Sequence, residues 1–326
     1  MKTNSLLLVL AVVLAVNVMG CLKKTAKNTA FVPGTALALP VDQGVKVGWA
    51  VPPLGEGVDT SQWASCQFVV DGRGDCWLKK GSNILMNVSK GFSFQLDKDI
   101  DDFVWLDGGD LQIISGNLLG TVEVALKHEH SPKGLLLVHF KPELKLPVNS
   151  PRFTQAGPHG IYIWGSNPKT SKNEIYFFSA SGKAIQVLFA SDEKIGAVGG
   201  DGVRTFAAVD HLILELSKKK MTGLYQDPKN PIQSLNYSKS MGLFYRTASG
   251  VSYLNPDNRK DIEFFRSLNT QVGLKNDVLY LCLGESSGVI KITGLEVLDQ
   301  FKPVPSAAAD GTQKVQSVDN AKKRSS

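Results

Sequence analysis

The chain has 326 residues, a formal net charge of +6 and four cysteines. Part of the basic excess lies near the two ends of the chain. No basic recognition helix or aromatic stacking motif accompanies it, so the sequence argues against nucleic acid as a partner. Helical periodicity is almost absent outside residues 261–268, which excludes the two-lobed α/β pattern of many solute-binding proteins.

The first twenty residues have the form of a secretory signal peptide. Lys2 precedes an apolar run over residues 6–16, and Val18-Met19-Gly20 stands before Cys21. The run is shorter than the roughly 20 apolar residues that a transmembrane helix needs. A cysteine at the cut site resembles the lipobox of bacterial lipoproteins. The resemblance implies cleavage before Cys21, acylation of its thiol and amine, and attachment to a membrane outside the cytoplasm.

The lipobox match is imperfect, and it leaves alternatives open. Val18 and Met19 stand where other residues are usual, so an ordinary secreted protein or an uncleaved anchor also fits. Leu22 follows the cysteine where Asp would retain a lipoprotein in the inner membrane of enterobacteria. By that resemblance we expect the outer membrane, facing the periplasm or the cell surface. Two or three acyl chains would hold the chain firmly, since each buried CH₂ contributes about 0.8 kcal/mol.

The remaining chain divides into three parts by composition. Residues 21–42 are rich in Lys, Thr, Ala and Pro without periodicity, which predicts a lipid-anchored tether. Residues 43–302 carry short runs of β-branched, aromatic and aliphatic residues between turn residues, which indicates an all-β domain. Residues 303–326 are mostly small or polar and are predicted to be disordered.

A weak internal repeat favours a β-propeller within the all-β class. Strand-like runs and Gly, Asp or Asn turns recur at a spacing of about 40 residues, the length of one four-stranded blade. The proposed copies are residues 63–96, 101–115, 152–188, 195–216, 232–254 and 270–292.

The length suits six or seven blades, and the ring must close because a blade cannot bury its faces alone. We expect closure where residues 45–51 pair beside residues 289–297. No named repeat supports the pattern, so another all-β sandwich or barrel remains the alternative.

The cysteines after Cys21 suggest one disulfide. Cys66 and Cys76 flank the predicted hairpin turn Asp71-Gly72-Arg73-Gly74. An oxidising compartment permits a bridge between them, although two buried thiols are the alternative. Cys282 lies in an apolar run and is expected to be a core thiol.

None of the candidate motifs matches the pattern of a catalytic site. Gly284-Glu285-Ser286-Ser287-Gly288 matches Gly-x-Ser-x-Gly, but a strand-like run follows it where a nucleophile elbow needs a helix. In hydrolases that use this motif, the catalytic histidine follows the serine along the chain. Here the last histidine, His211, precedes the serine. His128-Glu129-His130 and the aspartates over 97–102 are better explained as solvated loops. We therefore expect no cofactor, no metal site and no assigned catalytic residue.

A propeller commonly binds its ligand at the axial end of the ring, where loops from every blade converge. Turn positions nominate six polar residues for that surface: Asp107, Asp110, His159, Asp201, Asp210 and Asn276.

The leading hypothesis is a non-catalytic binding or scaffolding lipoprotein of the bacterial envelope. In this interpretation the propeller presents a broad face to an envelope protein partner. The alternative is a hydrolase that uses carboxylates or a metal at the propeller centre.

Overall fold

The computed structural model describes residues 44–53, 66–124, 130, 132, 134–179, 185–217, 220–266, 270–284 and 288–299. All of them belong to one unit of the chain. The predicted signal peptide, Cys21, the tether before residue 43 and the tail over 303–326 lie outside these residues. Within the described ranges, no helical segment has both the length and the apolar character needed to cross a bilayer.

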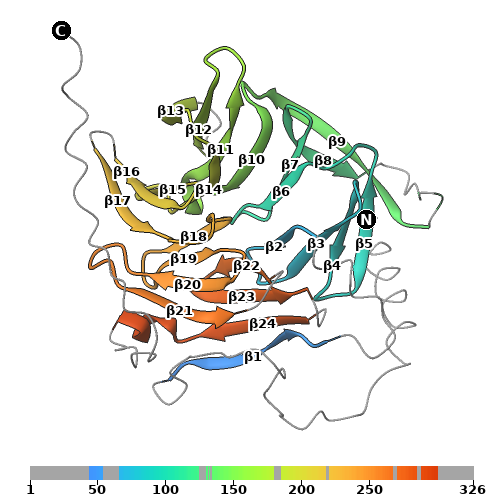
Figure 1. The fold of residues 1–326 in the computed structure, drawn as a ribbon. Coiled ribbons are helices and arrows are strands. Elements are labelled where there is room, and N and C mark those ends of the chain that lie inside the picture. Colours follow the sequence, from blue (N-terminus) through green and yellow to red (C-terminus); the bar gives the residue numbers. More distant parts are fainter. Residues whose placement is uncertain are drawn as a thin grey trace, which may run out of the picture. The chain divides into compact units, whose positions relative to one another are not determined.

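The described residues form six antiparallel four-stranded groups (Figure 1). Blade 1 comprises β2 (Phe68–Val70), β3 (Cys76–Lys80), β4 (Ile84–Asn87) and β5 (Phe92–Leu96); blade 2 comprises β6 (Asp102–Trp105), β7 (Leu111–Ser115), β8 (Leu118–Val124) and β9 (Leu136–Lys145). Blade 3 comprises β10 (Asn149–Gln155), β11 (Gly160–Asn167), β12 (Lys172–Ser179) and β13 (Ile185–Ser191); blade 4 comprises β14 (Ile195–Gly200), β15 (Thr205–Val209), β16 (Leu212–Leu216) and β17 (Met221–Gln226). Blade 5 comprises β18 (Ser234–Ser238), β19 (Gly242–Arg246), β20 (Gly250–Leu254) and β21 (Asp261–Arg266); blade 6 comprises β22 (Thr270–Lys275), β23 (Val278–Leu283), β24 (Gly288–Thr293) and β1 (Lys46–Val51).

The first strand of each blade lies innermost, and these six strands close a ring. β2 contacts β6, and the contacts continue through β10, β14, β18 and β22 back to β2. The fold is therefore a β-propeller, as the repeat predicts. The spacing of the sequence copies reflects one blade each.

The ring closes through β1, as expected from the sequence. β1 pairs antiparallel with β24, with Lys46 opposite Thr293 and Val51 opposite Val289. The last blade thus takes its outermost strand from the beginning of the domain. This pairing ties the two ends of the domain together and covers an edge that would otherwise be open.

Blades 1 and 2 depart from a regular propeller because their outer strands also pair. Phe94 to Leu96 of β5 run parallel to Leu136 to Val138 at the start of the long strand β9. The two blades consequently form one continuous eight-stranded sheet. The pairing removes two exposed strand edges at once.

Apolar side chains fill the spaces between neighbouring blades. Between blades 2 and 3, for example, Val104 and Ile114 pack with Phe153 and Ile163. Between blades 4 and 5, Phe206 and Ile213 pack with Leu235 and Tyr245. Alternate residues of a strand point to opposite faces, so each blade contributes to the packing on both of its sides.

The structure contradicts the predicted disulfide. Cys66 and Cys76 are both buried thiols, and no bridge joins them. The hairpin itself forms, with Val70 opposite Cys76 and Phe68 opposite Leu78. Continuing that register by two residues places Cys66 beside Lys80, four residues beyond Cys76. Both thiols instead pack with Cys282 in the apolar cluster between blades 1 and 6.

Candidate functional site

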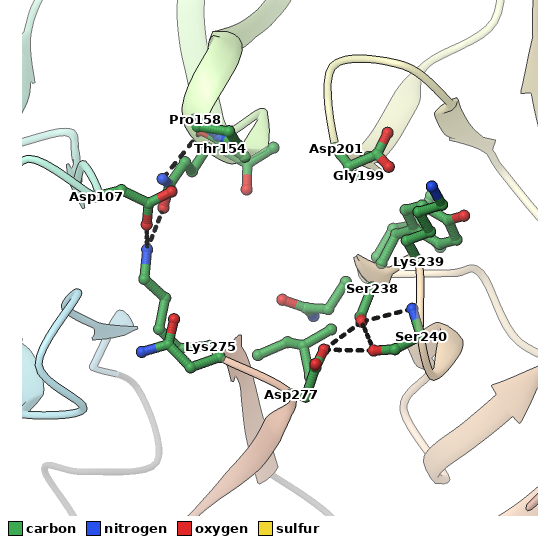
Figure 2. A pocket seen from close by; sticks show the side chains of 18 residues that line it. Asp107, Thr154, Pro158, Gly199, Asp201, Ser238, Lys239, Ser240, Lys275 and Asp277 are labelled. Atoms are coloured by element: carbon green, nitrogen blue, oxygen red, sulfur yellow. Dashed lines mark hydrogen bonds and ion pairs between the residues drawn. The ribbon is translucent and has the colours of Figure 1, made fainter. Parts of the chain in front are cut away.

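A cavity of about 640 Å³ opens where the inner strands of the propeller end (Figure 2). Blades 2 to 6 all contribute to its wall, which combines polar side chains with apolar surface. The lining residues with functional side chains are Asp107, Thr154, Gln155, Asp201, Asn236, Tyr237, Ser238, Lys239, Ser240, Lys275, Asn276 and Asp277.

Tight turns bring these side chains together. The β22–β23 hairpin turns through Asn276 and Asp277 alone, since Lys275 pairs with Val278. Both turn residues have positive φ, 49° and 57°, the conformation of a two-residue hairpin turn that favours Asn and Asp. The hairpin therefore places Lys275 at the end of β22 and Asp277 at the tip of the turn.

Neighbouring turns meet closely around the cavity. Gly157 has a φ of +57°, and a Cβ added there would lie 2.9 Å from the backbone oxygen of Asp201 in the next blade. The side-chain amide of Asn276 donates to the carbonyl oxygen of Gly72 in blade 1, at 3.2 Å. These contacts fix the rim of the cavity from blade to blade.

Lys275 is a buried cation at the cavity wall, with its side chain 8% exposed. Its Nζ forms an ion pair with Oδ1 of Asp107 and donates to Oε1 of Gln155 at 2.6 Å. Figure 2 shows Lys275 reaching across to Asp107. Burial would raise the pKa of Asp107, but hydrogen bonds from Lys275 and Gln155 outweigh it and lower the pKa. Asp107 is therefore held as a carboxylate.

A second polar group stands on another part of the wall. Ser238 Oγ and Ser240 Oγ both donate to Oδ1 of Asp277, at 2.5 and 2.6 Å. The two hydroxyl oxygens lie 2.8 Å apart. Because both bonds use Oδ1, the structure gives Oδ2 of Asp277 no hydrogen-bond donor from the described residues. That oxygen is available to a ligand or a water molecule.

The third carboxylate, Asp201, has a structural role. Its Oδ1 accepts the backbone N–H groups of Val203 and Arg204, at 2.9 and 2.8 Å, and so closes the β14–β15 turn. The charged side chains of the lining are three carboxylates and two ammonium groups. The cavity thus carries a formal excess of one negative charge.

The described side chains of the cavity do not form a set of metal ligands. No three His, Cys, Asp or Glu side chains gather into a possible metal site in the described part of the chain. Each cavity carboxylate already receives donors from the protein, and the Lys275 ammonium would repel a cation beside Asp107. The arrangement suits hydrogen bonding and proton transfer rather than calcium coordination.

The six residues predicted from the sequence to form the binding surface do not all lie at the cavity. Asp107, Asp201 and Asn276 line the cavity. Asp110 belongs to the same turn as Asp107, where its carbonyl accepts the N–H of Leu106 at 2.9 Å, but it is not part of the lining. His159 ends the short 3₁₀ helix η2 (Gly157–His159) beside the cavity, and its side chain lies outside the description.

Asp210 lies at the other end of the propeller. It occupies the turn between β15 and β16. The preceding turn of the same blade, between β14 and β15, lies at the cavity. The assignment of Asp210 to the same surface is therefore wrong, because successive turns within a blade alternate between the two axial ends.

The sequence analysis missed Lys275, Gln155, Ser238, Ser240 and Asp277. Asp277 directly follows Asn276, so the Asn-Asp turn signal contained both. Ser238 and Ser240 flank Lys239 between two strand-like runs, a further turn signal. No pattern in the sequence marks Lys275 or Gln155, since each ends an ordinary strand and its partner comes from another blade.

The Gly-x-Ser-x-Gly match falls in a hairpin, as the sequence indicated. Leu283 pairs with Gly288 across the connection between β23 and β24. Residues 285–287 lie outside the described residues. The strand–turn–strand context differs from the strand–turn–helix of a nucleophile elbow.

Comparisons with known proteins place the chain in a class by fold. No family model matches, and no curated protein matches by sequence. A gluconolactonase from Xanthomonas campestris has a similar structure, with a TM-score of 0.52, 9% identity, and coverage of 79% of this chain and 94% of that one.

Two further solved structures are similar at the same level. A luciferin-regenerating enzyme gives a TM-score of 0.50 at 11% identity, covering 77% of this chain and 96% of that one. A calcium-binding protein, regucalcin, from Agrobacterium tumefaciens gives 0.50 at 14% identity, covering 75% and 94%. At these identities the likeness establishes the fold, a six-bladed β-propeller in the described residues.

These comparisons contradict the leading hypothesis of a non-catalytic scaffold. The fold is shared with a gluconolactonase and a luciferin-regenerating enzyme, so it gives no support to a purely binding role. The lack of a local catalytic motif does not exclude activity, because the side chains that meet at the cavity come from different blades. The enzymes among these neighbours agree better with the alternative, a hydrolase that uses carboxylates or a metal at the propeller centre.

Proposed function

We propose that the chain is a metal-independent hydrolase of small, uncharged, hydroxyl-rich esters or lactones. One observation carries the proposal. The β22–β23 hairpin presents a buried ammonium group, Lys275, and a carboxylate, Asp277, two residues apart at the wall of a central cavity. Hydrolysis of an ester needs a base for water and a positive group for the carbonyl oxygen.

Asp277 is the proposed general base. Ser238 and Ser240 hold Oδ1, while Oδ2 accepts a proton from the attacking water. The water oxygen bonds to the carbonyl carbon and gives a tetrahedral intermediate. When the C–O bond to the leaving alcohol breaks, the protonated Asp277 returns its proton to that oxygen. The net change is addition of one water molecule across the ester bond.

Lys275 is the proposed stabiliser of the oxyanion. An ammonium group has three N–H donors, and two of them are directed to Asp107 and Gln155. The third can donate to the carbonyl oxygen of the substrate. Because Asp107 and Gln155 fix the ammonium in advance, little reorganisation is needed when negative charge develops.

The substrate class follows from the lining. The volume suits a small molecule, and the wall offers amide and hydroxyl groups at Thr154, Gln155, Asn236 and Asn276. A formal negative excess disfavours anionic substrates. A neutral sugar lactone has the required size, hydroxyl groups and electrophilic carbonyl, and the fold is shared with a protein described as a gluconolactonase.

The test is hydrolysis by the purified full chain of a panel of neutral lactones and esters, followed by pH titration in weakly buffered solution with chelator present. We expect turnover that resists the chelator. Asp277→Asn should lower kcat/KM by about 100-fold or more, whereas Asp110→Asn, which shares the turn of Asp107 but is not part of the lining, should not. No turnover across the panel, or equal losses in both variants, would refute the proposal.

We also propose that the enzyme is attached to the envelope through Cys21. The support is the signal-peptide pattern and its resemblance to a lipobox. Mass spectrometry of protein expressed in a bacterium should find the acylated cysteine at the N-terminus of the mature chain. Cys21→Ser should release the protein from the membrane fraction with unchanged specific activity, and membrane retention of this variant would contradict the anchor.

A further inference from the structure

Arg246 lies at the end of the propeller opposite the cavity. It is the last residue of β19 and faces Ser234, the first residue of β18. Its Nη1 donates to the backbone oxygen of Thr270, the first residue of β22, at 3.1 Å. The guanidinium therefore bridges blades 5 and 6 where their inner strands begin.

Three buried polar atoms in this region have no hydrogen-bond partner among the residues that the structure describes: Arg246 Nε, Ser234 Oγ and Thr270 Oγ1. Thr270 is 1% exposed. Nε–H can only donate, and both hydroxyls can donate. Leaving such groups unsatisfied inside a protein is costly, so their grouping around one guanidinium indicates a missing acceptor.

Arg246 also has no counter-ion among the described residues. The other arginines with printed contacts show the contrast. Arg204 pairs with Glu215 and Asp257, and Arg266 pairs with Glu263. Burial lowers the pKa of Arg246, and no neighbouring carboxylate opposes that effect. A water molecule would supply an acceptor, but it would leave the half-buried guanidinium without a counter-ion.

We propose that Arg246, Ser234 and Thr270 bind a small monovalent anion, chloride where it is available. Facing side chains on paired strands have Cβ atoms only about 5 Å apart. That spacing suits an ion of a single atom better than a carboxylate or phosphate group. The anion would accept from Nε–H and from the two hydroxyls, and it would neutralise the guanidinium between blades 5 and 6.

The anion site is separate from the proposed active site. Ser234 and Ser238 stand at opposite ends of β18, and four residues of strand span about 13 Å. The inference therefore does not depend on the hydrolase proposal. An anion at this position would act on stability by fastening the last two blades together.

The experiment is thermal unfolding of the full chain in sodium chloride or bromide, with sodium methanesulfonate keeping the ionic strength constant. Wild-type protein should gain Tm in a saturable way as the halide rises, because a ligand that binds only the folded state stabilises it. Arg246→Gln should abolish the halide-dependent gain. Arg266→Gln, which removes an exposed arginine, is the matched control and should keep it.

A second variant guards against failure of Arg246→Gln to fold. Thr270→Val keeps the shape of the side chain and removes one donor, so half-maximal stabilisation should need about tenfold more halide. A bromide-soaked crystal should show an anomalous peak beside Arg246 Nε. No halide-specific gain in the wild type, an unchanged gain in Arg246→Gln, or an ordered water in place of bromide would overturn the proposal.

Discussion

Each end of the propeller holds a cation, the buried Lys275 at the cavity and the half-buried Arg246 opposite it, and the surroundings of the two differ. At the cavity end, Lys275 is surrounded by acceptors, Asp107 and Gln155. At the opposite end, Arg246 donates to the backbone oxygen of Thr270, and its Nε has no partner within the described part of the chain. The inner strands of blades 5 and 6 run between these two places. The comparison shows that the fold itself compensates the charge of Lys275, whereas a ligand would compensate that of Arg246 in the proposal above.

The largest effect is expected at the cavity end. Lys275→Met removes the proposed oxyanion donor and should lower kcat/KM by about 100- to 1,000-fold. The loss should fall mainly on kcat, because the donor acts most strongly when charge develops. Steady-state kinetics with the best substrate of the panel would measure it.

Lys239→Met is the matched control for this variant, since Lys239 lines the same cavity but is exposed. We expect less than about a tenfold change, the size of effect that a solvent-exposed charge allows. Equal losses in the two variants would show that the cavity responds to net charge rather than to the position of Lys275.

The next effect concerns a buried anion at the Arg246 end, Asp102 at the start of β6. Its carboxylate receives the side-chain amide of Gln67 and the N–H groups of Phe103 and Phe153, at 2.9 and 3.0 Å for the latter two. Asp102 thus joins blades 1, 2 and 3. Asp102→Asn should cost about 1 to 3 kcal/mol at neutral pH, because an amide cannot accept all of these donors.

The raised pKa of Asp102 also predicts that the free energy of unfolding depends on pH. Burial raises its pKa from 3.8 to about 6, against the hydrogen bonds and Arg152, which lower it. The folded state therefore holds the proton more tightly than the unfolded state. Below about pH 4 this proton adds roughly 3 kcal/mol to the free energy of unfolding. The contribution is lost as the pH rises through about 6.

Urea unfolding of the wild type and Asp102→Asn across that window would measure the difference. The stability advantage of the wild type should narrow as the pH rises. Asp261, whose pKa burial also raises to about 6, titrates in both proteins and cancels in the comparison. A pH-independent difference would show that Asp102 does not titrate in this window.

A smaller effect tests the contrast between the two cations directly. Ser234→Asp would give Arg246 a counter-ion from the protein itself. We expect the free energy of unfolding to rise by about 1 to 3 kcal/mol without halide, the worth of a hydrogen bond to a charged group. The halide dependence of Tm should disappear.

Ser240→Asp is the control, because it places a carboxylate just beyond the other end of β18, beside Asp277. Like charges there should destabilise the protein. If both substitutions destabilise it equally, Arg246 does not lack a counter-ion.

The smallest effect is expected between the two ends, in the apolar cluster of Cys66, Cys76 and Cys282. Burial raises the pKa of all three thiols, that of Cys76 to about 11. A thiol reagent should therefore react slowly with the folded protein and quickly after unfolding. Adding a reductant should leave Tm unchanged, whereas loss of a disulfide would cost about 2 to 5 kcal/mol.

The fold was predictable because a propeller repeats one local unit. Strand-like runs and turn residues recur once per blade, so the class, the six copies and the pairing of residues 45–51 with the last blade could be read from spacing. The Cys66–Cys76 bridge was wrong because the position of the turn does not fix the strand register beyond it. The join between β5 and β9 was missed because it pairs strands of different blades.

The candidate site was only partly predictable for the same physical reason. Asp107, Asp201 and Asn276 were nominated from turn chemistry, which is local. Lys275 has a function only through Asp107 and Gln155, which lie 168 and 120 residues away along the chain. Asp210 was misplaced because the sequence shows where a turn occurs but not at which axial end it lies.

The sequence by itself determined the all-β class, the blade period, the closing strand and three of the residues at the cavity turns, because each depends on short-range alternation and turn preference. Only the tertiary structure decided which polar side chains meet. It paired Lys275 with Asp107 and gave Arg246 no counter-ion from the described residues, because closing the ring sets side chains from different blades against one another. Those contacts depend on strand register and blade packing, which no local pattern encodes.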